Sequence, residues 1–202
     1  WDTGSSIDFD RMFDGAVAFN QDVSGWDTAS VTNMREMFRG ASSFNQSLSG
    51  WLTGNVETFE GMFAFTNFNG DIGGWDVSGS GNFSAMFQGN SVFSEDLSNW
   101  NVSNGGSFIS MFELASSFDS DLSSWLPSSA QRFDFMFSGA SSFDSDLSSW
   151  DVSSVTHFES MFEGASSFNG NIDDWSVGQV SSPARFSQML RNATSFSGDL
   201  SC

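Results

Sequence analysis

The pair Met-Phe recurs along the chain at almost constant spacing, and this period constrains the fold more than any other feature. The pairs begin at Met12, Met37, Met62, Met86, Met111, Met136 and Met161. Met189-Leu190 is a variant eighth copy, 28 residues after the seventh. Units this short cannot bury their apolar side alone and must stack on one another. The sequence therefore predicts a single repeat solenoid over 1–202, with units starting near 9, 34, 59, 83, 108, 133, 158 and 186.

Further aromatic residues keep the same register. A second Phe follows each pair, at Phe19, Phe44, Phe68, Phe93, Phe118, Phe143, Phe168 and Phe196. A Trp follows in turn, at Trp26, Trp51, Trp75, Trp100, Trp125, Trp150 and Trp175. The chain has 24 Phe and 8 Trp but no Tyr, which fits slots too dry to satisfy a hydroxyl. We expect equivalent rings of neighbouring units to stack into buried ladders.

Each unit divides into two parts with different patterns. Apolar residues at i, i+3, i+4 and i+7 over Met34–Ala41 predict a short helix or 3-10 turn. The following Ser- and Asn-rich part predicts a short strand around Val23, Leu48, Ile72, Leu97, Leu122, Leu147, Ile172 and Leu200. The expected fold class is α/β: a leucine-rich-repeat-like solenoid of eight coils of about 25 residues, with one short parallel strand and one short helix or 3-10 turn per coil.

The charge balance excludes some partners. Six Arg and no Lys face 25 acidic residues, so the formal net charge is −19. Nucleic acid is an unsuitable partner for such a chain, because phosphate binding requires a basic surface. No apolar run approaches the ~20 residues of a membrane span. The single Cys, Cys202, allows no disulfide within the chain.

Two polar ladders follow the repeat. Asp22, Asp71, Asp96, Asp121, Asp146 and Asp199 precede the predicted strands. They either cap turns by accepting backbone N–H bonds, which we favour, or bind calcium between coils at Asp96, Asp121 and Asp146. The other ladder is Asn20, Asn45, Asn69, Asp119, Asp144 and Asn169, for which we expect a structural role in satisfying turn backbone groups. No cofactor other than possible calcium is expected.

The inventory of catalytic groups is nearly empty, so we predict that the protein is not an enzyme. His157 is the one histidine, and it occupies a variable repeat position. The chain has no Cys-His pair and no Gly-x-Ser-x-Gly motif, so no catalytic or cofactor-binding residue is assigned. Four glycosylation sequons occur, and Asn101 is the most plausible acceptor among them.

The repeats resemble a known family. The strings Val31–Phe44, Val155–Phe168 and Phe19–Asp27 are similar to the Met-Phe-rich branch of the BspA-like leucine-rich-repeat surface proteins, which are bacterial surface-protein repeats of about 26 residues. The resemblance covers essentially the whole chain. It implies a leucine-rich-repeat-like solenoid that is displayed on cells or secreted and acts in adhesion or recognition. The chain departs from that branch by using Phe where it often has Met.

These observations favour a non-catalytic extracellular or cell-surface scaffold: a structural, adhesive or filament component that makes protein–protein contacts. The alternative is a module that recognises a glycan or a protein through its strand face. Phe65, Phe135 and Leu126 are the clear off-pattern apolar residues, and their scarcity favours the scaffold. Both terminal units are as apolar as the central ones, and Trp1 already lies in register. We therefore expect other subunits, or domains of a longer protein, to cover the ends.

Overall fold

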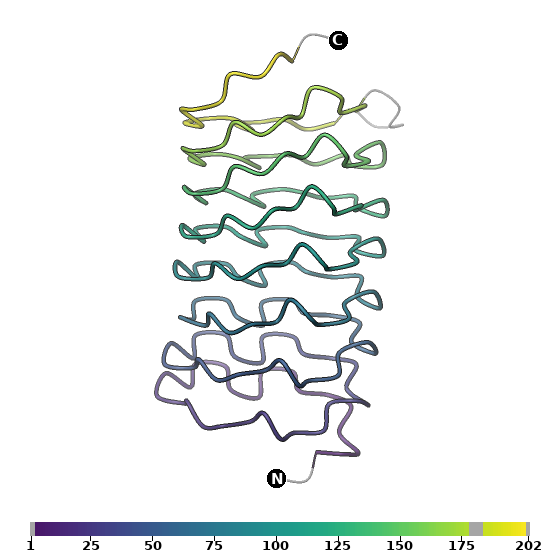
Figure 1. Cartoon of the computed structure of the whole chain (residues 1–202), viewed down its shortest axis with the longest axis vertical. Helices are drawn as coiled ribbons and strands as arrows, with labels where there is room; N and C mark the ends of the chain where they lie inside the picture. The colour runs from purple at the N-terminus through teal and green to yellow at the C-terminus, as the bar shows by residue number, and fades with distance from the viewer. Residues whose placement is uncertain (1–2, 178–183, 201–202) are drawn as a thin grey trace.

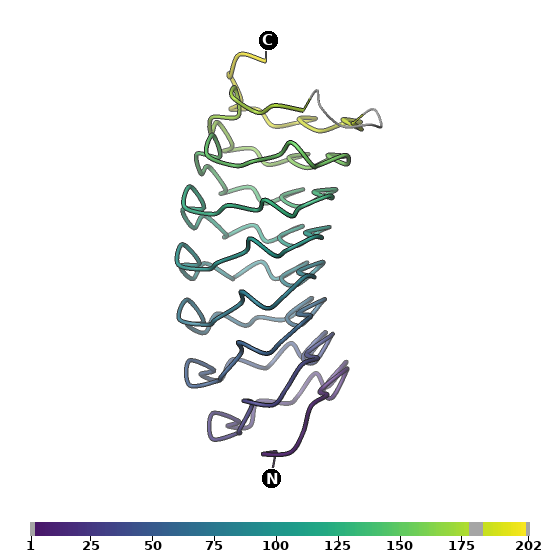
Figure 2. The ribbon, with the colours of Figure 1, turned by 90° about the vertical axis from the view of Figure 1, so that its right-hand side faces the viewer.

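The chain winds into a stack of coils along one axis, with its two ends at opposite ends of the stack (Figure 1). The computed structural model describes residues 3–177 and 184–200. Trp1 and Cys202, which the sequence analysis singled out, lie outside these ranges. The view turned by 90° shows the same regular stacking from the side (Figure 2). We number the coils 1–8, one for each repeat unit, from the N-terminus.

The predicted α/β class is wrong. The described residues contain no helix and no extended strand, and their regular pairing is limited to isolated parallel bridges between neighbouring coils. No described helix is long and apolar enough to cross a membrane. The bridges join one residue per coil, and we call this set the bridge column: Asp8, Asn33, Thr58, Asn82, Ser107, Arg132, His157 and Arg185.

A chain of turns replaces the predicted helix. We call residues 9–16 and their equivalents the turn segments: 9–16, 34–41, 59–66, 83–90, 108–115, 133–140, 158–165 and 186–193. In coil 1, the N–H groups of Met12, Asp14 and Ala16 donate to carbonyls three residues earlier. The alternating N–H groups at 9, 11, 13 and 15 instead donate to carbonyls of coil 2, at 2.7–2.9 Å. A helix cannot form because half of its donors leave the coil.

The backbone dihedrals give a second reason. Arg11 and Gly15 have φ of 52° and 69°, and equivalent residues in the other coils also have positive φ. Positive φ at the third residue of a four-residue turn is typical of type II turns. Successive turns of this kind bring every third or fourth residue to the same side. The apolar spacing that predicts a helix is therefore equally compatible with this chain of turns.

The predicted strand fails because its carbonyl groups bond elsewhere. The carbonyl of Leu97 accepts the backbone N–H of Trp100 at 3.1 Å and the indole Nε1–H of Trp125 at 2.9 Å. The same indole-to-carbonyl bond recurs in five further junctions, from Trp51 to Val23, Trp75 to Leu48, Trp100 to Ile72, Trp150 to Leu122 and Trp175 to Leu147. Carbonyls engaged in this way are not left to form a sheet ladder.

The core consists of aromatic columns that run along the stack. Phe rings of the Met-Phe pairs lie 5.5–5.9 Å from their equivalents in neighbouring coils, measured between ring centroids. Within a coil, Phe112 and Phe118 stack at 3.8 Å, and both are completely buried. The expected ladders of stacked rings are therefore present. The apolar period positions these columns whether the intervening backbone is helical or not.

The 24-residue unit is accommodated by two polar side chains. In coil 2, the N–H of Phe44 donates to the Ala41 carbonyl. In the shorter coil 3, the N–H of Phe68 donates to the Thr66 hydroxyl at 3.3 Å. The buried Asn90 of coil 4 then donates to the Phe68 carbonyl at 2.8 Å. Thr66 and Asn90 thus replace backbone bonds that the missing residue removes.

Candidate functional site

The Asp column closes turns. Asp22, Asp71, Asp96, Asp121 and Asp146 each accept the backbone N–H of the residue two positions later, at 2.8–3.0 Å. This is the hydrogen bond that the turn-capping interpretation predicts. The backbone N–H and then the hydroxyl of Ser98 lower the pKa of Asp96. The hydroxyl and then the backbone N–H of Ser123 lower the pKa of Asp121. These carboxylates are therefore held in their charged form.

The three residues predicted to bind calcium lie in one column on successive coils, with serine hydroxyls between them. Ser120 donates to Asp96 and Ser145 donates to Asp121, each at 3.4 Å. A surface hollow is lined by Asp121 and Asp146 among others. Within the described ranges, no three His, Cys, Asp or Glu side chains are close enough to hold one metal ion. Calcium binding at Asp96, Asp121 and Asp146 stays a prediction, which a melting experiment can test.

The Asn column connects coils. Each side-chain oxygen accepts the backbone N–H of the equivalent residue in the next coil, from Asn20 to Asn45, Asn45 to Asn69, Asn69 to Ser94, Asp119 to Asp144, Asp144 to Asn169 and Asn169 to Ser197. The distances run from 2.6 to 3.1 Å. Satisfying turn backbone groups was the expected role. The sequence did not indicate that these groups belong to the neighbouring coil.

Asn101 and His157 also have structural surroundings. Asn101 is exposed, and its side-chain oxygen accepts the N–H of Ser103 at 3.2 Å. Its glycosylation stays a prediction. His157 Nδ1 lies 2.7 Å from the Thr156 hydroxyl, and the His157 carbonyl accepts the N–H of Phe133. The histidine thus takes part in the bridge column.

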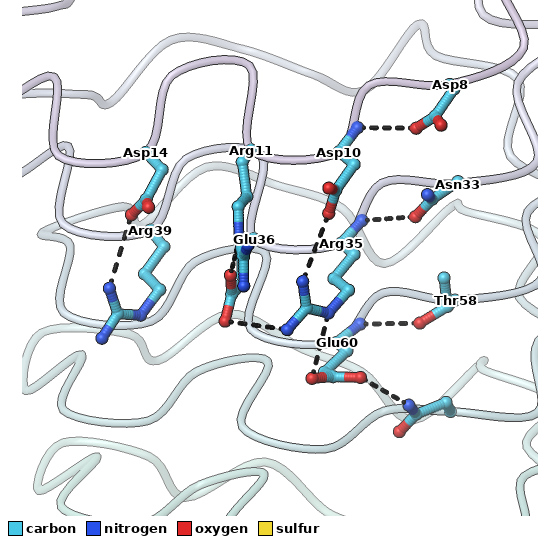
Figure 3. A network of polar contacts seen from close by, with 11 residues as sticks. Asp8, Asp10, Arg11, Asp14, Asn33, Arg35, Glu36, Arg39, Thr58 and Glu60 are labelled. Carbon is cyan, nitrogen blue, oxygen red and sulfur yellow. Dashed lines mark hydrogen bonds and ion pairs between the residues drawn. The ribbon is translucent and has the colours of Figure 1, made fainter.

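An arginine network covers the turn segments of the first coils (Figure 3). The ion pairs join Arg11 to Glu36, Arg35 to Asp10, Glu36 and Glu60, and Arg39 to Asp14. Burial raises the pKa of Glu36, but the hydrogen bond from Arg11 and the surrounding guanidinium charges together lower it below its usual value. Each of these arginines is therefore satisfied by carboxylates of its own or an adjacent coil.

An exposed apolar strip interrupts this charged face. In most turn segments the second position with positive φ is glycine, but it is Phe65 in coil 3 and Leu114 in coil 5. The Phe65 ring covers Gly89, and Leu114 covers Gly139, because an added Cβ on either glycine would meet those side chains within 2.7 Å. We call these four residues the Phe65–Leu114 strip. The sequence identified Phe65 as off-pattern but missed Leu114, whose signal is the glycine of its column.

The geometry defines a class of protein first: a stack of coils whose columns of equivalent residues run the length of the described chain. The particular family follows from the comparisons with known proteins. Its model matches residues 1–67, 55–138 and 123–202, and the chain belongs to this family, described as "Mycoplasma protein of unknown function, DUF285". No curated protein and no solved structure matches the chain. Three successive matches agree with the internal repeat.

Proposed function

We propose that this protein is a non-catalytic scaffold, secreted or displayed at the cell surface, which makes protein–protein contacts through the side of its coil stack. Two features of the sequence support the proposal: the tandem repeats of the family and the resemblance to BspA-like surface proteins. Stacked repeats provide long regular surfaces, which repeat proteins commonly use for binding. The polar ladders described above serve the stack itself, which leaves the off-pattern side chains as the candidates for contact.

The observation that carries the proposal is the Phe65–Leu114 strip. Phe65 and Leu114 have φ of 57° and 60°, yet their side chains remain 46% and 55% exposed. A left-handed conformation costs an L-residue ~1–2 kcal/mol, which glycine avoids. Such strain without full burial in return suggests selection for another role. The Arg39 guanidinium lies 5.6 Å from the centroid of the Phe65 ring. Aromatic and arginine side chains are enriched in protein interfaces.

The alternative sequence-based function loses the surface it required. It placed a glycan or protein ligand on a face of parallel strands, and the described coils form no such sheet. The non-catalytic part of the proposal is supported by the surroundings of His157. Its nearest column neighbours are Arg132 and Arg185, and neither is a nucleophile or a general base at neutral pH.

A double substitution, Phe65→Gly with Leu114→Gly, tests the contact role because glycine is the residue that other coils use in this column. Relief of strain should keep or slightly raise the melting temperature. We expect retention of the purified, labelled chain on intact source cells to fall at least tenfold, a loss of about 1.4 kcal/mol of binding free energy. Protease treatment of intact cells should remove the native protein if it is displayed outside.

Leu52→Asp with Leu126→Asp provides the matched control. Both leucines are exposed, and they occupy a column in which Asp27, Asp76 and Asp151 cap turns. This variant also removes two exposed apolar side chains, but away from the strip, so its retention should equal that of the unmodified chain. Equal losses in both variants, or none in the strip variant, would refute the contact role. Full protection of the native protein from external protease would refute surface display.

A further inference from the structure

We propose that coil 8 of one copy stacks on coil 1 of a second copy, so that the protein assembles head to tail. The inference concerns the two ends of the stack and not the Phe65–Leu114 strip. It therefore goes beyond the proposed function, and either proposal can fail without the other. The occupant is argued from backbone groups, charges and apolar surface, in that order.

Backbone donors and acceptors at the two ends are complementary. At each of the seven internal junctions, four alternating N–H groups of one turn segment donate to four carbonyls of the next coil. Coil 8 presents the equivalent N–H groups at Phe186, Gln188, Leu190 and Asn192, and no described residue accepts from them. Coil 1 presents the equivalent carbonyls at 8, 10, 12 and 14, which likewise have no described donor. A second copy in the same register satisfies all eight groups at once.

The charges at the two ends also match. Arg185 and Arg191 belong to coil 8, whereas Asp8 and Asp14 hold the same columns in coil 1. Adjacent coils already pair such residues, because Arg39 lies 3.4 Å from Asp14 in the same column. In the junction, Arg191 stands next to Asp14 of the second copy, and Arg185 stands next to its Asp8. Each arginine thus gains an acidic neighbour without any change of register.

Apolar surface supplies the third argument. Phe186 and Ile7 are 43% and 61% exposed, although the Phe-column residues of inner coils are completely buried. An apolar hollow of about 320 Å³ lies beside coil 8, lined by Trp175, Phe186, Met189 and Leu200 among others. Covering it with another coil continues the aromatic columns across the junction. Because the two contacting surfaces differ, the contact does not close on itself, and copies can add indefinitely along the axis.

Disulfide trapping tests the junction and its register. In a Cys202→Ser background, Asp14→Cys combined with Arg191→Cys places one thiol at each end of every copy. The two ends are too far apart to join within one chain (Figure 1). After mild oxidation we expect disulfide-linked dimers and a ladder of larger multimers on non-reducing gels. The pair Asp14→Cys with Arg39→Cys, in neighbouring coils of the same column, should instead close within one copy and shows that the column geometry permits the bond.

A mismatched pair provides the register control. Gln21→Cys with Arg191→Cys keeps an exposed thiol on coil 1 but moves it out of the turn segment. This variant should give at least tenfold less multimer than the Asp14 pair. Equal multimer yields in both variants would overturn the proposed register. Monomers alone from the Asp14 pair, when the Asp14–Arg39 control closes, would overturn the contact itself.

Sedimentation of the unmodified chain gives an independent measurement. In a reducing buffer at ~0.15 M salt, where the Debye length is about 8 Å, long-range repulsion between the acidic copies is screened. We expect the weight-average mass to rise with protein concentration and to rise less for Arg185→Asp with Arg191→Asp. A constant monomer mass up to millimolar concentration would reject head-to-tail assembly.

Discussion

The two halves of each coil are joined to their neighbours by different chemical groups. In the turn segments the backbone makes the junction: the N–H groups of Phe108, Ser110, Phe112 and Leu114 all donate to carbonyls of coil 6. We call residues 19–26 and their equivalents the loop half. There, Trp indoles, the Asn column and serine hydroxyls make nearly all the junctions. The one backbone bond between coils in the described loop half runs from Leu147 to Asn171.

This difference explains where the sequence varies. Backbone junctions do not depend on which side chain points outward, so one column of the turn segments can hold Gly40, Phe65, Gly89 and Leu114 in succession. All six arginines lie in turn segments or in the bridge column just before them. The loop half has no such freedom, because its side chains are the junction. Features for contact with other molecules are therefore expected on the turn segments.

The largest expected effect tests the core that both halves share. Phe112 is completely buried between Phe87 and Phe137, with centroids at 5.5 and 5.6 Å. Phe112→Ala removes the ring from a close-packed column and should lower the free energy of unfolding by ~3–5 kcal/mol. Chemical denaturation followed by Trp fluorescence measures it. Leu114→Gly, two residues away but exposed, is the control and should cost little. A loss below about 1 kcal/mol for Phe112→Ala would contradict the buried column.

A smaller effect separates the loop half from the turn segments. Replacing Trp125 by β-(3-benzothienyl)alanine keeps the shape of the side chain but removes the N–H that donates to Leu97. Leaving the buried indole site without its donor should cost ~1–2 kcal/mol of unfolding free energy. The same replacement at Trp175, which is only partly buried, should cost less. Equal stability of the modified and natural protein would show that side-chain junctions are dispensable.

The sequence predicted the columns but not the backbone between them. The positions of Phe112, Phe118 and Trp125 could be assigned because stacking requires equivalent apolar residues at a constant period. Secondary structure could not, since a helix and a chain of turns share the same apolar spacing. Positive φ was visible in one column, where glycine predominates. In the other it was hidden, because Arg11 and Ser110 adopt it as well.

The polar columns were predictable in type but not in connectivity. Aspartate in a Ser- and Gly-rich segment indicates a capped turn, and the structure contains those turns. The bond from the Asp119 side chain to the backbone of Asp144 crosses between coils. So does the serine hydroxyl of Ser120 beside Asp96. Sequence spacing cannot reveal such contacts, because they depend on the relative rotation of successive coils.

A still smaller effect concerns pH. The pKa of Asp121 is lowered in the folded protein, first by the Ser123 hydroxyl. A lowered folded pKa means that the stabilisation is complete above the unfolded value, ~3.9, and is lost as pH falls below it. Asp121→Asn keeps an acceptor for the turn but does not titrate. Between pH 5 and pH 3, its melting temperature should therefore fall by about 2 °C less than that of the unmodified chain. Parallel melting curves would contradict this assignment.

The smallest expected effect is that of calcium on the loop half. Calcium prefers six to eight oxygen ligands, roughly 2.3–2.6 Å away. Asp96, Asp121 and Asp146 instead use an oxygen each to close their own turns, and serine hydroxyls lie between neighbouring carboxylates in the column. We therefore expect identical melting curves in millimolar calcium and in chelator at matched ionic strength. Magnesium serves as the control for general screening of the acidic surface. A rise in melting temperature that is specific to calcium and disappears in Asp121→Asn would show that the column binds the ion. The loop half would then be joined by a metal as well as by side chains.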